Sequence, residues 1–118
     1  MDARRQVGRH GEDVVARRLA ELGWEVLDRN WRCARGELDI VARDGGCAVA
    51  VEVKTRRTGA CGSGLEAVTP AKVARLRRLL AAWLDTRDER FEEVRIDAVA
   101  VTLPRAGAAQ LDHVRGIG

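Results

Sequence analysis

The segment Ala48–Thr55 constrains the fold more than any other, because it is an apolar strand that carries an acid and a base. Side chains alternate between the two faces of a strand, so its three valines share one face while Ala50, Glu52 and Lys54 share the other. Both faces are apolar before Glu52, which is typical of a central strand covered on two sides. We therefore predict an α/β protein whose sheet is flanked by helices.

The neighbouring sequence patterns predict the other elements. They are a helix at about residues 9–22 ending at Gly23, strands at Trp24–Trp31 and Gly36–Arg43, a helix from Pro70 to about Asp85 with Thr69 as its N-cap, and a strand at Glu93–Leu103. Short loops favour an antiparallel meander for the first three strands, whereas the connection through the second helix suits a crossover to a parallel neighbour. The chain thus predicts one domain over residues 1–118, with a mixed sheet in an αβββαβ core at about 8–103. In the tail at 104–118, Leu111–Val114 is a candidate edge strand.

The composition argues against several classes of protein. No apolar run is long enough for a membrane span, and the first residues lack the apolar segment of a secretory signal. The three cysteines form no C-x-x-C pair, so we expect neither a disulfide framework nor a zinc site, and a reduced, cytoplasmic setting. The net charge of +3 permits a polyanionic partner without requiring one.

Two carboxylates interrupt neighbouring predicted strands. A turn at 44–46 would place Asp39 opposite Glu52, with the two Cβ atoms ~4.5–5.5 Å apart. Two like charges at this distance repel each other unless a cation lies between them. A divalent metal with oxygen ligands is one solution, and a buried salt-bridge cluster in which Lys54 neutralises both acids is the other.

Two charged residues on the predicted helices are further candidates. Glu12 falls on the apolar stripe of the first helix, so it is expected to face the sheet; the alternative is an acid interacting with the helix dipole. That stripe consists of Val15, Ala16, Leu19 and Leu22. Lys72 would be explained if the start of its helix faced a phosphate, and the alternative is a solvated side chain. Lys54 and Lys72 are the only lysines among 21 basic residues, which favours a need for an ammonium group over chance retention.

Five motifs, taken in order, resemble a known family. They are G-x-x-G-E at Gly8–Glu12, R-N-W-R at Arg29–Arg32, G-E-L-D-I-V-A-R-D at Gly36–Asp44, V-E-V-K-T-R at Val51–Arg56 and A-V-T-P-x-K at Ala67–Lys72. From about Gly8 to Val101 the chain resembles the YraN-like family of bacterial proteins. That family is similar to the PD-(D/E)XK nuclease superfamily, with its restriction-endonuclease-like fold, and to archaeal Holliday-junction resolvases. Leu38 stands where the superfamily pattern has proline.

The resemblance implies roles for the four candidate residues. By position it implies that Asp39 and Glu52 bind a metal and that Lys54 is the catalytic lysine. It also implies that Glu12 is the helix acid of the resolvase branch, a catalytic residue and a further metal ligand. Glu37 and Asp97 match family positions without a role, and Arg95 and Asp97 could simply pair at the surface.

We accordingly predict a Mg²⁺- or Mn²⁺-dependent endonuclease that hydrolyses phosphodiester bonds of DNA, with branched or flap structures as candidate substrates. Lys54 would orient or help deprotonate the attacking water, and the carbonyl of Val53 is a further candidate ligand. Arg56, Arg57 and Lys72 would contact backbone phosphates. The glycine-rich loop Arg56–Ala67 is a candidate for closing over the substrate.

The alternative hypothesis is a non-catalytic module that keeps the nuclease fold and binds nucleic acid or a protein. A homodimer is expected of a junction resolvase. The apolar residues of the tail are candidates for its interface, or else for an edge strand or a frayed end; they are Leu111, Val114 and Ile117.

Overall fold

The computed structural model describes residues 3–58 and 68–117 of the chain. Within them, two helices and five strands follow one another as α1 (Ala3–Glu21), β1 (Glu25–Cys33), β2 (Gly36–Asp44), β3 (Cys47–Arg57), α2 (Pro70–Asp85), β4 (Glu93–Leu103) and β5 (Gln110–Val114). The predicted order αβββαβ is confirmed, and the candidate edge strand is present as β5.

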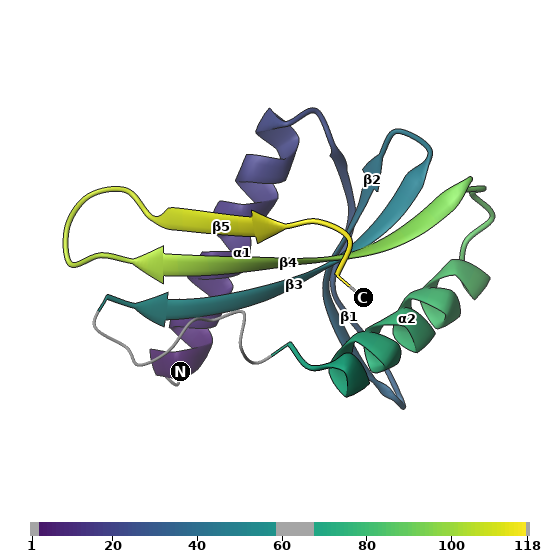
Figure 1. Ribbon diagram of the computed structural model, residues 1–118, viewed down its shortest axis with the longest axis horizontal. Helices are drawn as coiled ribbons and strands as arrows, with labels where there is room; N and C mark the ends of the chain where they lie inside the picture. Colours follow the sequence, from purple (N-terminus) through teal and green to yellow (C-terminus); the bar gives the residue numbers. More distant parts are fainter. Residues whose placement is uncertain (1–2, 59–67, 118) are drawn as a thin grey trace.

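All five strands form a single mixed sheet in the order β1-β2-β3-β4-β5 (Figure 1). The first three strands form an antiparallel meander, β4 pairs with β3 in parallel, and β5 pairs with β4 in antiparallel orientation. The parallel pair is the crossover that the second helix makes possible. This arrangement matches the restriction-endonuclease-like core that the motifs imply.

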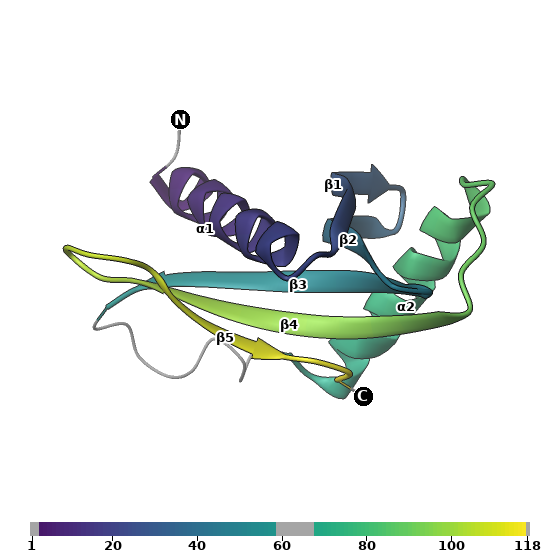
Figure 2. The same cartoon turned by 90° about the horizontal axis from the view of Figure 1, so that it is seen from above.

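The two helices cover opposite faces of the sheet (Figure 2). Val49 and Val51 of β3 pack against Val15 and Leu19 of α1. Ala50, on the other face of β3, packs in a second cluster with Leu76, Leu79, Leu80 and Trp83 of α2. The predicted alternation along β3 is therefore confirmed, and β3 is a central strand covered on both sides.

Most strand ends differ from the prediction by one or two residues, and the differences in α1 and at the end of β3 bear on the site. α1 begins at Ala3 rather than at about residue 9, because charged and polar residues with good helix propensity extend it beyond its apolar stripe. Leu22 of that stripe is 42% exposed, since the helix ends at Glu21 and Gly23 turns the chain with φ of +87°. β3 continues to Arg57, so the predicted loop begins later, and its residues 59–67 lie outside the described part of the chain.

α1 packs closely against β3 at Gly11, which is buried. A Cβ added at Gly11 would lie 1.8 Å from Thr55 Oγ1 and 2.8 Å from Thr55 Cβ, so rotation of the hydroxyl could not relieve the clash. A glycine inside a helix is otherwise unfavourable, and here the packing requires it.

We expect Gly11→Ala to lower the free energy of unfolding by about 1–3 kcal/mol, because overpacking outweighs the gain in helix propensity. Urea unfolding followed by circular dichroism measures this change. Gly8→Ala is the matched control, because its Cβ would meet no atom within 4 Å and alanine should stabilise the helix. Equal stabilisation by both substitutions would mean that α1 does not lie this close to β3.

Candidate functional site

Asp39 lies where β2 and β3 separate. Hydrogen-bonded pairing of these strands runs from Asp44 opposite Cys47 to Ile40 opposite Val51, the register that the turn predicted. One step further, where Asp39 would face Glu52, the pairing ends, and Val53 N–H donates instead to Asp39 Oδ2 at 2.9 Å. The carboxylate thus takes the place of a strand carbonyl and is fixed by the backbone of β3.

Four carboxylates of α1, β2 and β3 influence one another around this point. Burial raises the pKa of Asp39 to about 7, and the negative charges of Glu52, Glu12 and Glu37 add to the rise, against the hydrogen bond from Val53. Burial also raises the pKa of Glu12, although a hydrogen bond with Asn30 acts in the opposite direction. Such a cluster favours either protonation or a bound cation.

Glu52 shares a face of β3 with Ala50, as the alternation predicted, and the structure shows that α2 covers this face. Its side chain is 15% exposed, and Lys72 Nζ lies 3.1 Å from its Oε1. The predicted alternative of a salt bridge therefore occurs with a different partner, Lys72 rather than Lys54. The predicted alternative of a solvated Lys72 is wrong, because the first turn of α2 carries this ammonium group to the acid of β3.

Lys54 lines a cleft of about 490 Å³ between α1 and β3. Glu12 lines the same cleft, together with Val7, Gly8, Val53, Thr55 and Arg57. Glu12 is half-buried and faces the sheet, as its place on the apolar stripe predicted. Glu12 and Lys54 thus both line this opening, although alternation along β3 directs the Lys54 side chain to the face opposite Val53 and Thr55. Asp39 is hydrogen-bonded to the backbone of Val53 beside it.

The predicted phosphate-binding residues have different surroundings. Arg57 is exposed and lines the cleft of Lys54. Arg56 is half-buried, and its Nη1 is buried without a hydrogen-bond partner among the described residues. Lys72 is engaged with Glu52. Arg57 is thus the member of this set that the structure leaves most accessible.

The predicted metal ligands are near one another without forming a coordination sphere. Among the described residues, no three histidine, cysteine, aspartate or glutamate side chains are arranged to hold a metal ion. The chemistry of the donor set nevertheless fits Mg²⁺ or Mn²⁺, because Asp39, Glu52 and the Val53 carbonyl are all oxygen donors. The N–H and C=O of one residue point to the same side of a strand, so this carbonyl also faces the gap beside Asp39.

Sequence reasoning missed Asn30 and gave no role to Glu37. Asn30 has a positive φ of 52°, and its hydrogen bond with Glu12 partly opposes the rise in the pKa of that carboxyl group. Glu37 Oε2 accepts from Arg32 Nε at 2.9 Å, which joins β1 and β2 beside the turn between them. The R-N-W-R motif carried the signal for both contacts, since it supplies Asn30 and Arg32.

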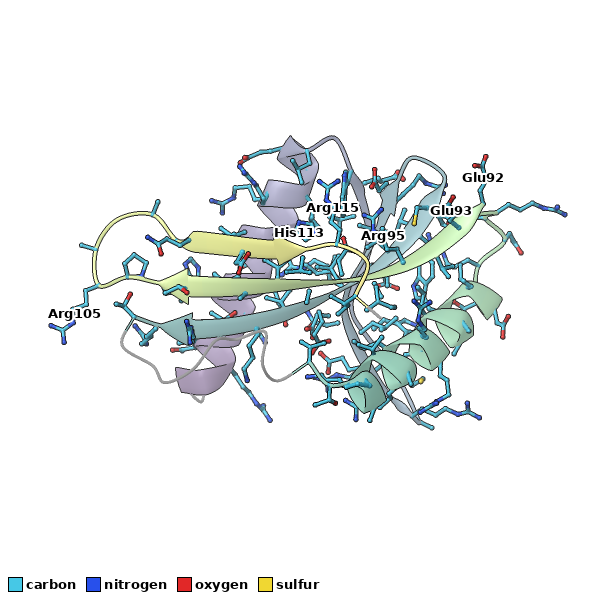
Figure 3. All side chains as sticks on the ribbon, viewed as in Figure 1. Glu92, Glu93, Arg95, Arg105, His113 and Arg115 are labelled. Carbon is cyan, nitrogen blue, oxygen red and sulfur yellow. The ribbon has the colours of Figure 1, made fainter. Side chains whose placement is uncertain are left out.

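Asp97 belongs to a separate cluster, and the expectation that it pairs with Arg95 at the surface is only half right. Arg95 Nε does donate to Asp97 Oδ1 at 2.8 Å, but Asp97 is 0% exposed. His113 Nε2 lies 2.9 Å from Asp97 Oδ2, and Gly116 N–H donates to Oδ1 at 3.0 Å. Figure 3 labels Arg95 and His113, which reach Asp97 from β4 and β5.

This cluster fixes the C-terminal segment against the sheet. Ile117 N–H donates to the Ile96 carbonyl at 2.9 Å, and Leu111 and Ile117 pack against the two core clusters. Val114 is 37% exposed at the edge of the sheet. The segment is therefore an ordered edge rather than a frayed tail.

Two remaining sequence features can be placed. Cys33 and Cys47 are free, and Cys61 lies outside the described residues. None of the helices in the described ranges is both long and apolar enough to cross a membrane.

Comparison with known proteins identifies the family. A profile described as "Uncharacterised protein family UPF0102" matches residues 11–101. A UPF0102 protein of Kineococcus radiotolerans is 55% identical over 116 residues, covering 98% of this chain and 95% of the relative. UPF0102 proteins of Beutenbergia cavernae and Streptomyces coelicolor are 56% and 53% identical, and they cover 100% and 99% of this chain and match over 100% and 92% of their own length. The chain therefore belongs to UPF0102, the YraN-like family that its motifs resemble.

Proposed function

We propose that this protein is a metal-dependent phosphodiesterase that hydrolyses nucleic acid, with DNA as the first substrate to test. The observation that carries the proposal is the position of Asp39, a carboxylate fixed by the β3 backbone at a break in the sheet and surrounded by three other carboxylates. Folding alone gives no reason to gather these charges. The chain's only two lysines lie beside them, one in the cleft and one on Glu52.

Asp39 and Glu52 would hold Mg²⁺ or Mn²⁺, with the Val53 carbonyl as a further donor. When bound, the ion would polarise the phosphoryl group and lower the pKa of a water molecule. Lys72 would release Glu52 to that ion and offer its ammonium group to a phosphate of the substrate. This exchange keeps the charge of Glu52 compensated in both states.

Lys54 and Glu12 would act from the shared cleft. Lys54 is exposed, so its ammonium group is free to orient the attacking water and offset the charge that develops on the phosphorus oxygens. Burial raises the pKa of Glu12, which suits a carboxyl group that holds or moves a proton. Arg57, on the rim of the cleft, would contact the backbone without reading sequence.

The test is incubation of the pure protein with Mg²⁺ or Mn²⁺ and a panel of labelled duplex, flap and four-way DNA, with single-stranded RNA as a further substrate. We expect cleavage of at least one substrate, and a loss of at least about 100-fold in rate for Lys54→Ala. Lys54→Arg keeps the charge but not the compact ammonium group, so it should restore little activity. Arg78→Ala, an exposed cation on α2, is the control that should cleave normally. Cleavage that persists in Lys54→Ala contradicts the assignment.

A non-catalytic nucleic-acid- or protein-binding module is the second candidate, and two observations favour it. Glu52 is tied to Lys72, and no ready-made set of three ligands exists among the described residues. This candidate predicts binding that does not depend on metal and no cleavage of any substrate. A salt titration then separates the two kinds of partner, because phosphate contacts give a steep dependence on salt.

A further inference from the structure

A second cleft, of about 460 Å³, lies on the other side of α1 from the cleft of Lys54. It is lined by Arg5, Gly8, Arg9, Glu12, Asn30, Arg32 and Glu37. Gly8 and Glu12 line both clefts, so the two openings meet on the N-terminal half of α1. Figure 2 shows this half of the helix above the C-terminal half of β3, the region of the proposed site.

Gly8 has no structural reason to be glycine. It is inside a helix, its φ is not positive, and a Cβ would meet no atom within 4 Å. Glycine in a helix interior is less favourable than alanine. Whereas Gly11 three residues later is required by Thr55, Gly8 leaves open space between the two clefts.

Arg5 and Arg9 are also unfavourable for folding. They are four residues apart on one helix, so their like charges repel each other, and the first turn of α1 has no acid to interact with the helix dipole. Both side chains are exposed, and neither makes an ion pair with any described residue. Arg32 pairs with Glu37 through Nε, yet its side chain is 76% exposed.

The charges follow a simple order across α1. Cations line each cleft, with Arg5, Arg9 and Arg32 in one and Lys54 and Arg57 in the other. Glu12 lies between them, and Glu37 lies in the second cleft. A polyanionic chain with negative groups at regular intervals would meet cations at both ends of this line.

We propose that the two clefts form one path for a single strand of nucleic acid, which crosses α1 over Gly8 and is held by Arg5, Arg9 and Arg32 on one side and by Lys54 and Arg57 on the other. This inference rests on the proposed function only in taking a phosphodiester chain as the ligand. It adds a phosphate-binding region that the predicted set of Arg56, Arg57 and Lys72 does not contain. Contacts of this kind position the strand without reading its sequence.

The test measures binding of a labelled single-stranded oligonucleotide by fluorescence anisotropy across a range of salt, in EDTA and again in Ca²⁺. We expect Arg5→Gln/Arg9→Gln to weaken binding at least about tenfold at low salt. It should also reduce the slope of log K against log salt by about 1.4, or about 0.7 for each lost phosphate contact. Arg17→Gln/Arg18→Gln removes the same charge from the exposed part of the same helix and should leave the slope unchanged. Equal slopes for the two double variants overturn the proposal.

Gly8→Leu tests the crossing point separately. Leucine is a better helix former than glycine and meets no neighbour at its Cβ, so we expect a melting temperature at least as high as that of the natural protein. It should nevertheless weaken oligonucleotide binding about tenfold, because its side chain occupies the space between the clefts. Gly8→Ala should show a smaller effect in the same direction. Unchanged binding by Gly8→Leu overturns the path, as does absence of binding by the natural protein in both EDTA and Ca²⁺.

These readouts separate the path from the hydrolase. Arginine-dependent binding without cleavage by the natural protein leaves the path standing and removes the proposed reaction. Normal cleavage of single-stranded substrate by both Gly8→Leu and Arg5→Gln/Arg9→Gln would support the hydrolase and overturn the path.

Discussion

Asp97→Ala is expected to lower the free energy of unfolding by about 3–5 kcal/mol, which is the largest effect on stability that the structure predicts. The carboxylate is 0% exposed and accepts hydrogen bonds from Arg95, His113 and Gly116. Removing it leaves the Arg95 guanidinium half-buried without its main partner, and it removes two contacts that hold the C-terminal segment to β4, those with His113 and Gly116. Urea unfolding gives the change, and hydrogen exchange of the β5 amides should show the largest local loss of protection.

Asp97→Asn and Asp112→Ala complete this experiment. Asn keeps the shape and one acceptor oxygen, so the loss should be smaller than for alanine, and Asp112 is an exposed acid on β5 whose removal should change stability by less than about 0.5 kcal/mol. An unfolding free energy for Asp97→Ala within about 0.5 kcal/mol of the natural protein would contradict the role given to this cluster.

The pH dependence of the Asp97 contribution has a definite sign. Burial alone would raise the pKa of Asp97, but hydrogen bonds from Arg95, Gly116 and His113 outweigh it and hold the pKa below its ordinary value of 3.8. A lowered pKa stabilises the folded state above the ordinary pKa, and this stability is lost as the pH falls through the folded-state pKa. The difference between natural protein and Asp97→Asn should therefore be complete at pH 7 and shrink below about pH 4.

The sequence was sufficient to predict the elements of the core because local rules dominate there. α2 begins at the predicted residue, with Thr69 as its N-cap and Pro70 in its first turn. The alternation in Ala48–Thr55 correctly predicted a strand covered on both faces. The turn at 44–46 fixed the register that brings Asp39 towards Glu52. These features depend on residues close together in the chain, so they can be read without knowing the tertiary structure.

What the sequence could not predict depends on contacts between distant elements. Glu52 pairs with Lys72 from another element rather than with Lys54 from its own strand, because the start of α2 lies over that face of the sheet. The sequence pattern predicts Asp97 at the surface, but β5 and Gly116 cover it. The requirement for Gly11 likewise appears only when Thr55 is opposite it. In each case the deciding partner is at least 16 residues away in the chain.

Asp39→Asn is expected to lose activity as severely as Lys54→Ala while making the protein more stable at alkaline pH. The pKa of Asp39 is raised to about 7 by burial and by the charges of Glu52, Glu12 and Glu37. Below the ordinary pKa of 3.8, Asp39 is protonated in both the folded and the unfolded state, so it does not lower the stability of the fold. As the pH rises, the unfolded state ionises more readily than the folded state, so the stability lost through Asp39 grows and is complete above about pH 7. Asn carries no charge, and its oxygen can still accept the hydrogen bond from Val53 N–H.

We therefore expect Asp39→Asn to be more stable than the natural protein by about 1–3 kcal/mol at pH 8, a range that allows for screening of this half-buried group by solvent. The two proteins should become equally stable below about pH 4. Thermal unfolding at several pH values measures the difference. Asp85→Asn, which neutralises an exposed acid at the end of α2, should show no comparable trend. If Asp39→Asn is less stable than the natural protein at pH 8, the carboxylate has a structural role and the cluster needs another explanation.

The same variant should lose metal-dependent cleavage by at least about 100-fold, because the proposed ion loses a charged ligand. Binding of Mn²⁺ provides a readout that does not require activity. An ion that binds only the folded protein raises its melting temperature, so Mn²⁺ at pH 8 should stabilise the natural protein and Asp85→Asn but not Asp39→Asn. Equal stabilisation of all three would place the ion elsewhere. Asp39→Asn replaces one oxygen by nitrogen and removes the negative charge. If this change raises stability and removes activity, the carboxylate is retained for chemistry rather than for folding.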